Sequence, residues 1–202
     1  MQRRDIGDLL LLSLLWGAAY LFMRAAVPAF GPAALIALRL AIAVAVLLPL
    51  LAWRGGLAQL RAHPGPLLVQ AVVFTAGPFL MLGWAAQHLT AGLLAVLNAT
   101  APLFAALLAH FVFHERLGAW RSAGLVIGFG GVALLTAGSA SLRSAQGLLA
   151  VGAVLLVSAV WAVGANYTRR RLGGMDSLAL TVGSVALAGL ALALLAVATW
   201  PA

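Results

Sequence analysis

The chain has 202 residues, of which 64% are hydrophobic and only 8% are charged. Soluble domains average about 45–50% apolar and about 25% charged residues, so a soluble fold would lack the polar side chains needed to coat its surface. The absence of cysteine excludes a disulfide framework and a thiolate metal site. We therefore expect an all-α integral membrane protein, whose net charge of +8 reflects membrane topology rather than binding of nucleic acid.

Seven apolar runs follow one another, each long enough for the roughly 20 residues that a membrane-spanning helix needs. The separators are short and carry the glycine, proline and charged residues that end helices. The first run follows "MQRRDIGD" and is expected to be an uncleaved span, because it is too long for a signal-peptide core and no small-residue cleavage site follows it. We expect a multispanning helical bundle with spans at residues 8–28, 33–53, 66–86, 91–113, 119–138, 147–168 and 178–200.

Arginines gather in alternate separators, which predicts the orientation of the chain. A cytoplasmic excess of basic residues places the N-terminus in the cytoplasm, with Arg143 as the exception. The alanine- and leucine-rich composition with arginine in place of lysine suggests a bacterial inner membrane. The arginines of the expected cytoplasmic side are Arg3, Arg4, Arg54, Arg61, Arg116, Arg121, Arg169, Arg170 and Arg171.

Two local sequence patterns predict a close helix contact in the fifth span and a capped start of the seventh span. Gly124, Gly128 and Gly131 lie on one side of the fifth span, and small residues at such spacing are typical of close helix contacts in membranes. Asp176 precedes Ser177 at the start of the seventh span and is expected to cap that helix.

Polar side chains form one stripe along the first span. With about 100° per residue, Ser13, Trp16, Tyr20 and Arg24 fall within an arc of roughly 80°. The remaining residues of these turns are mainly Leu, Ala, Phe and Met. A helix with one polar stripe turns that stripe away from lipid, so we expect it to face protein or a water-filled cavity.

Arg24 and Arg39 are both expected in the outer half of the membrane, where the sequence places no carboxylate. The partners left open are backbone carbonyls, water, lipid phosphate, a residue in further spans or an anionic substrate. Arg24 could instead snorkel to the outer headgroups, and Arg39 could have a structural role bound to carbonyls. The four acids, all expected on the cytoplasmic side, are Asp5, Asp8, Glu115 and Asp176.

A weak internal repeat relates the first and sixth spans at an offset of 145 residues. It aligns Ser13 with Ser158, Trp16 with Trp161 and Arg24 with Arg169. Two leucine-rich helices can align by chance, which is the alternative. Because the two spans cross the membrane in opposite senses, the repeat predicts inverted topology, an architecture common among secondary transporters.

The order and spacing of several segments resemble the EamA-type drug/metabolite transporter family. "LLWGAAYLFMR" and "LIALRLAIA" resemble its first two spans, with Arg39 at an arginine position of the family. "GWAAQHLTAGLLAVLNATAPLFAALLAHFVFHERL" carries a helix proline, Pro102, and then a glutamate, Glu115. "GLVIGFGGVALL" resembles the fifth span, and "LLVSAVWAVGANYTRRR" opens a second half.

The resemblance implies ten spans in two inverted five-helix halves. Residues 1–140 would be the first half, and residues 141–202 would hold the first two spans of the second, which leaves three spans of the family missing. The implied function is a secondary transporter, exporting small organic metabolites such as amino acids or drugs by alternating access. The alternatives are a truncated, non-transporting scaffold or remnant and, less favoured for want of clustered acids or a nucleophile, a membrane enzyme.

The candidate substrate-binding residues are the mid-span aromatic and polar side chains. The alternative for the aromatics is simple helix packing, while Pro102 removes a backbone hydrogen bond and could expose a carbonyl near Asn98. We expect a small, carboxylate-bearing substrate attracted by Arg39, contact with the lipid bilayer, no nucleic acid, and neither cofactor nor metal. The oligomeric state is left open, a homodimer included. The candidate residues are Trp16, Tyr20, Arg39, Asn98, Trp161 and Asn166.

Overall fold

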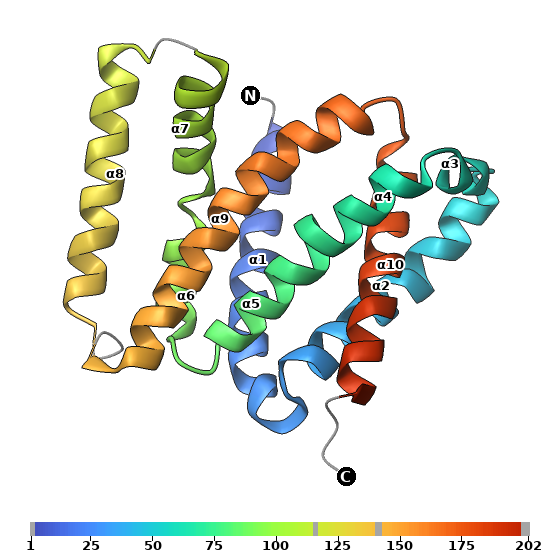
Figure 1. The fold of residues 1–202 in the computed structure, drawn as a ribbon, viewed down its shortest axis with the longest axis horizontal. Coiled ribbons are helices and arrows are strands. Elements are labelled where there is room, and N and C mark those ends of the chain that lie inside the picture. The colour runs from blue at the N-terminus through green and yellow to red at the C-terminus, as the bar shows by residue number, and fades with distance from the viewer. Residues whose placement is uncertain (1–2, 115–116, 140–142, 199–202) are drawn as a thin grey trace.

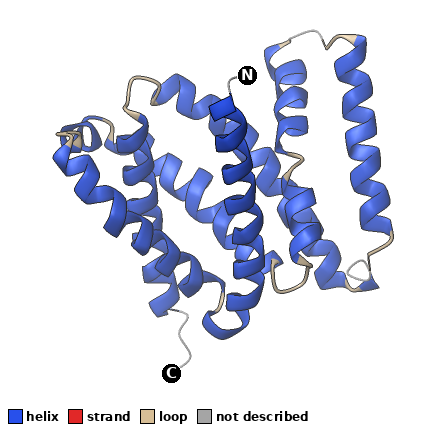
Figure 2. Cartoon of the chain, turned by 180° about the vertical axis from the view of Figure 1, so that it is seen from behind, coloured by secondary structure: helices blue, strands red, loops and turns tan. Residues whose placement is uncertain are grey.

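The computed structural model describes residues 3–114, 117–139 and 143–198. In these ranges the regular elements are helices, arranged as an irregular bundle (Figures 1 and 2). In chain order they are α1 (Arg3–Phe30), α2 (Pro32–Trp53), α3 (Leu57–Ala62), α4 (Pro64–Ala71), the π-helical segment η1 (Val72–Ala76), α5 (Gly77–Ala85), α6 (Ala91–Asn98), α7 (Ala101–Phe113), α8 (Ala119–Ala137), α9 (Ala145–Arg171) and α10 (Ser177–Ala198).

Seven stretches of the described chain are long and apolar enough to cross a membrane, which confirms the predicted all-α multispanning class. The third span is not one regular helix, because α4, η1 and α5 follow one another within Pro64–Ala85. The fourth is interrupted between α6 and α7. There Pro102 lies at the start of α7 and leaves the Asn98 carbonyl without the N–H that a continuous helix would supply.

The separator between the second and third spans contains a helix that the sequence analysis did not predict. Helix α3 consists of "LAQLRA", which is rich in good helix formers. Its Gln59 side chain accepts a hydrogen bond from the backbone N–H of Asp176 at 2.8 Å. The contact ties this connection to the start of α10.

Helix ends follow the local rules of capping. Asp176 accepts hydrogen bonds from the backbone N–H groups of Leu178 at 2.9 Å and Ala179 at 3.3 Å, so its predicted capping role is confirmed. Between α1 and α2 the chain turns at Gly31, whose φ of 72° lies in the left-handed region that favours glycine. Pro32 then begins α2.

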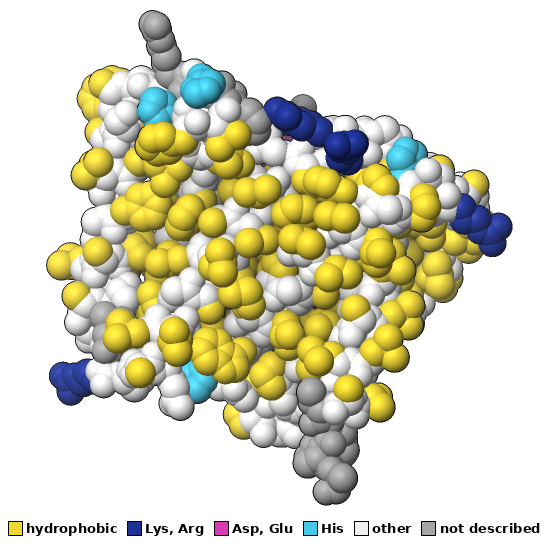
Figure 3. Space-filling model, in the orientation of Figure 1, with side chains coloured by type: hydrophobic (Ala, Val, Ile, Leu, Met, Phe, Trp, Pro, Cys, Tyr) yellow, Lys and Arg dark blue, Asp and Glu magenta, His cyan; other side chains and the backbone are white. Residues whose placement is uncertain are grey.

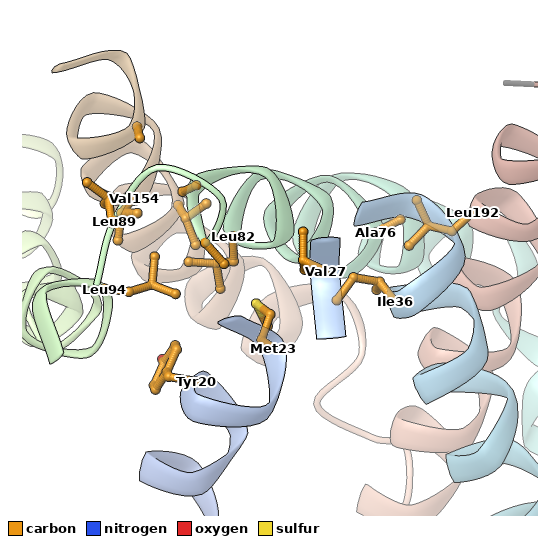
Figure 4. Packing of buried hydrophobic residues seen from close by; sticks show 14 of the residues in the cluster. Tyr20, Met23, Val27, Ile36, Ala76, Leu82, Leu89, Leu94, Val154 and Leu192 are labelled. Atoms are coloured by element: carbon orange, nitrogen blue, oxygen red, sulfur yellow. The ribbon is translucent and has the colours of Figure 1, made fainter. Parts of the chain in front are cut away.

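The buried core lies where α1 meets α2, α5 and α6, with α9 and α10 closing it (Figure 4). Helix α10 packs most extensively against α2, and α9 packs against α5, α6 and α7. The largest fully buried side chains are almost all aliphatic. The labelled members of the cluster are Tyr20, Met23, Val27, Ile36, Ala76, Leu82, Leu89, Leu94, Val154 and Leu192.

Helix α8 stands at one side of the molecule beside α7 (Figures 1 and 2). The predicted glycine contact face is wrong for two of its three members. A Cβ at Gly128 would meet the side chain of Leu103, whereas a Cβ at Gly124 or Gly131 would meet open space. The reason is that α8 has few contacts with the rest of the described chain, so most of its surface faces outward.

The face seen in Figure 3 is apolar over a broad central band, and basic side chains lie at its edges. Leu14, Phe22 and Ile127 are each more than 70% exposed. An apolar surface of this kind is favourable in contact with lipid and unfavourable in contact with water. It follows that the core is small and that much of the bundle surface is built to face a bilayer.

We predict that Gly164→Ala destabilises the protein and that Gly152→Ala, on the same helix, does not. A Cβ at Gly164 would lie 2.8 Å from the Phe74 ring, whereas a Cβ at Gly152 would meet nothing within 4 Å. Overpacking costs about 1–3 kcal/mol, while alanine gains about 1 kcal/mol in helix propensity at both positions. Thermal unfolding in detergent should show a lower Tm for Gly164→Ala only. Equal Tm values would mean that α9 does not pack closely on η1.

Candidate functional site

The polar stripe of α1 faces other helices, as predicted. The Trp16 ring meets the Trp161 ring of α9 edge-on, with centroids 6.4 Å apart. Tyr20 is buried, and its hydroxyl accepts a hydrogen bond from the Asn98 side-chain amide at 2.6 Å. Ser13 is the exception, because its hydroxyl donates to the Leu9 carbonyl of its own helix.

Arg24 binds backbone carbonyls, which selects one of the partners that the sequence left open. Its Nη1 donates to the carbonyl oxygens of Ala86 at 2.6 Å and Leu89 at 2.7 Å. Both acceptors lie just beyond α5, where a helix leaves carbonyls unpaired and carries partial negative charge. Arg24 therefore fastens α1 to the end of α5 through one of its two terminal nitrogens.

Helix α9 donates a hydrogen bond to the Phe74 carbonyl of the third span. In an α-helix this carbonyl would accept from the N–H of residue 78, but Pro78 has none, and Phe74 lies in the π-helical segment η1. The indole N–H of Trp161 donates to the Phe74 carbonyl at 3.1 Å. Because no water can serve this carbonyl in the membrane core, the contact holds α9 against η1.

The fourth span repeats the arrangement. Pro102 deprives the Asn98 carbonyl of its helical partner, as the sequence analysis expected. The Ser158 hydroxyl, fully buried one turn before Trp161, lies 3.4 Å from the carbonyls of both Leu97 and Asn98. The freed carbonyl is thus not exposed to a cavity but faces a side chain of α9.

Asn98 also has an unsatisfied side-chain atom. Its amide nitrogen donates to Tyr20, whereas its Oδ1 is buried and has no hydrogen-bond partner in the described part of the chain. A buried acceptor without a donor is costly, so this atom marks a place for a donor from a ligand, a water or a rearranged side chain.

Arg39 has no carbonyl partner among the described residues, contrary to the structural role that the sequence analysis weighed. Its guanidinium lies over the Phe79 ring, 5.2 Å from the centroid, and within the described residues it makes neither a hydrogen bond nor an ion pair. Phe79 meets Trp161 edge-on at 5.9 Å. Trp16, Trp161, Phe79 and Arg39 consequently form a continuous chain of ring contacts across α1, α9, α5 and α2.

A groove of about 420 Å³ runs between α1 and α2. We call it the α1–α2 groove. Of the six candidate binding residues only Arg39 lines it, and the other lining side chains are apolar. The larger of these are Leu15, Phe22, Met23, Leu35, Ile36, Leu38 and Ile42.

Asn166 lies apart from the other candidates. Its amide nitrogen donates to the Ala162 carbonyl of its own helix at 3.3 Å, and its Oδ1 accepts from Arg169 at 2.5 Å. Both contacts belong to the final turns of α9, beyond Trp161. The structure thus brings together Trp16, Tyr20, Asn98 and Trp161, joins Arg39 to them through Phe79, and leaves Asn166 outside.

Sequence reasoning missed the third span's contribution to the site. Phe74, Pro78 and Phe79 hold Trp161 and Arg39 in place, yet none was a candidate. The signal was available, because a proline inside an expected span frees the carbonyl four residues earlier, as it does at Pro102. Glu115, the glutamate of the family-like stretch, lies outside the described residues.

We predict that the cost of Trp161→Phe depends on Pro78. Removing the indole N–H leaves the Phe74 carbonyl short of a donor and should destabilise the protein by about 1–3 kcal/mol. In a Pro78→Ala background the new backbone N–H can serve that carbonyl, so the same change should cost less. Unfolding free energies of the four proteins form a double-mutant cycle, and a coupling energy near zero would rule out this hydrogen bond.

We predict that Arg24→Met destabilises the protein, because the carbonyls of Ala86 and Leu89 lose their charged donor. Hydrogen bonds to charged groups contribute about 1.5–3 kcal/mol each, so a clear loss of stability is expected. Arg24→Lys keeps the charge and should be intermediate. Arg143→Met, at an exposed position without a hydrogen bond to described residues, is the control. Equal Tm values for Arg24→Met and the control would contradict the anchoring role.

Comparison with known proteins shows which sequences this chain resembles. The sequence model of the EamA-like transporter family matches residues 6–137, which contain α1 to α8. The chain is also 26% identical over 166 residues to the uncharacterized transporter YoaV of Bacillus subtilis (strain 168), an alignment that covers 81% of this chain and 56% of the Bacillus protein. No solved structure matches the chain.

The chain thus spans little more than half the length of the relative that it matches. The family model, in contrast, accounts for most of the chain, including the helices that carry Trp16, Tyr20, Arg39 and Asn98. On this match the protein belongs to the EamA-like transporter family.

Proposed function

We propose that this chain forms the substrate-recognising part of a secondary transporter for small organic molecules. The observation that carries the proposal is the Arg39 guanidinium, which lines the α1–α2 groove without a hydrogen bond or ion pair to any described residue. A cation inside a span is costly and usually marks a substrate or ion pathway. Membership of a transporter family and the name of the Bacillus relative support the same conclusion.

The architecture proposed is that of two inverted halves, with residues 1–140 as the first and residues 141–202 as the start of the second. Helices α1 and α9 run in opposite directions along the bundle, as the inverted relation of the two Trp-bearing helices requires (Figure 1). Alternating access would then move one half against the other around the aromatic cluster. Trp161, bonded to Phe74 of the other half, lies at this junction.

The proposed orientation has the N-terminus in the cytoplasm of a bacterial cell and the chain in the inner membrane. Basic side chains of α3 and of the last turn of α9 support it, since cytoplasmic connections are enriched in arginine. The proposed direction is export of metabolites such as amino acids or drugs, with a carboxylate recognised by Arg39. The rival, a non-transporting scaffold, is an outcome of the following test.

Proteoliposomes containing the purified chain and loaded with a mixture of small metabolites should lose a subset of them faster than protein-free liposomes. Mass spectrometry of the external medium measures this release. Release at the protein-free rate for every compound would support the scaffold and contradict transport.

Arg39→Ala and Arg39→Lys should both slow release about tenfold or more, because a lost charged hydrogen bond costs about 1.5–3 kcal/mol and lysine cannot form the planar two-point contact. Arg143→Ala removes the same charge from an exposed position outside the groove and should leave release unchanged. Wild-type rates in both Arg39 variants would remove Arg39 from substrate recognition.

A further inference from the structure

The Arg39 guanidinium, which has no hydrogen bond or ion pair to a described residue, defines the kind of group that the α1–α2 groove can hold. The side chain presents five N–H donors, and it lies over the face of the Phe79 ring. An aromatic face attracts the cation but accepts none of these hydrogen bonds in the plane of the guanidinium. The N–H groups along the edge of the planar guanidinium fit a carboxylate, which accepts two parallel hydrogen bonds.

The rest of the groove defines the body of the ligand. Its walls are hydrocarbon side chains from both helices, among them Leu15 and Phe22 of α1 and Ile36 and Ile42 of α2. The volume of about 420 Å³ lies within the range of small-molecule sites, which is roughly 300–1,000 Å³. A polar body would lose its hydration here without gaining hydrogen bonds.

No described acidic side chain borders this groove. Asp5 and Asp8 lie in the first turns of α1, and Asp176 caps α10. Asp8 precedes Leu15, the first groove residue of α1, by seven residues, or about 10 Å of helix. An ammonium group in the groove would therefore have no counter-charge among the described residues, which is unfavourable in an apolar surrounding.

We propose that the α1–α2 groove binds small monoanions that have an apolar body and no amino group, with the carboxylate on Arg39 and the body along the wall of Leu15, Phe22 and Ile42. This substrate class rests on the proposed function and narrows it. It excludes zwitterionic amino acids as the preferred ligands, because their ammonium group has no acceptor at this place.

A phospholipid headgroup is the rival anion. Arg39 lies seven residues after Pro32, the first residue of α2, and so about 10 Å along the helix from that end. A headgroup would have to sink by that distance to meet the guanidinium in its observed position over Phe79. A small amphipathic anion can enter without such distortion.

The test compares four probes with the same phenyl-propyl frame and different charges. They are 3-phenylpropionate, its neutral amide 3-phenylpropionamide, the zwitterion phenylalanine and the cation 3-phenylpropylamine. Calorimetric titration of the full chain in phosphatidylcholine nanodiscs should show 3-phenylpropionate binding at least about tenfold more tightly than each of the others. Equal or tighter binding of phenylalanine, or no measurable binding of any probe, would overturn the proposal.

Two variants locate the site. Arg39→Gln should remove the preference for the anion, whereas Arg143→Gln, which deletes an exposed arginine outside the groove, should keep it. Ala19→Phe places a ring in the groove beside an intact Arg39 and should weaken binding of 3-phenylpropionate at least about tenfold. Circular dichroism and Tm confirm that each variant is folded. An unchanged preference in folded Arg39→Gln, or full binding in folded Ala19→Phe, would contradict the assignment.

Nanodiscs that contain phosphatidylglycerol separate the two sources of anion. If the small anion is the ligand, its affinity should change little when anionic lipid is added. If phosphatidylglycerol abolishes the binding, a headgroup occupies Arg39 and the proposal is wrong. A nanodisc does not separate two compartments, so this experiment measures binding and not transport. A chain that binds the monoanion without transporting it would support the substrate proposal and contradict the transport proposal. A chain that transports other molecules but does not bind the monoanion would do the reverse.

Discussion

The arrangement of this bundle depends on one constraint, which is that a backbone carbonyl inside a bilayer needs a donor from the protein. Pro78 and Pro102 each remove an N–H from a helical ladder within a span, as Pro28 and Pro49 do inside α1 and α2. Helix α9 compensates for the N–H groups missing at Pro78 and Pro102. Trp161 donates to the Phe74 carbonyl, and Ser158 lies within reach of the Asn98 carbonyl. The sixth span is thereby held against the third and fourth. At least 60 residues of chain separate the donor from the acceptor in each of these hydrogen bonds.

Helix α1 is fixed to the same two interrupted spans by its own polar stripe. Arg24 satisfies carbonyls after α5, and Tyr20 accepts from Asn98 beside the break before α7. These contacts use the polar capacity of the stripe for structure. Beside the stripe, the side-chain oxygen of Asn98 and the guanidinium of Arg39 have no hydrogen-bond partner in the described chain. The chemistry of the groove follows from Arg39, because the other walls of the groove are hydrocarbon.

The number of spans and the inward face of α1 could be predicted from the sequence, since bilayer thickness sets helix length and the helical period sets the stripe. The hydrogen-bond partners of Arg24 could not be predicted, because several kinds of acceptor were chemically equivalent. Its observed acceptors lie more than 60 residues away along the chain. Helix α3 was hidden in a separator with three glycines and a proline. Phe79 was overlooked because a phenylalanine in an apolar run carries no sign that a cation rests on it.

The most direct test of this account is the distance between the Trp161 indole nitrogen and the Phe74 carbonyl carbon in a lipid bilayer. Solid-state NMR on protein with ¹⁵N-indole tryptophan and carbonyl-¹³C phenylalanine measures their dipolar coupling, and Trp161→Phe assigns the signal. The hydrogen bond of 3.1 Å between nitrogen and oxygen predicts a separation of about 4 Å. Strong dephasing of that one indole signal is the expected result. The absence of dephasing would show that α9 does not serve the carbonyl that Pro78 leaves open.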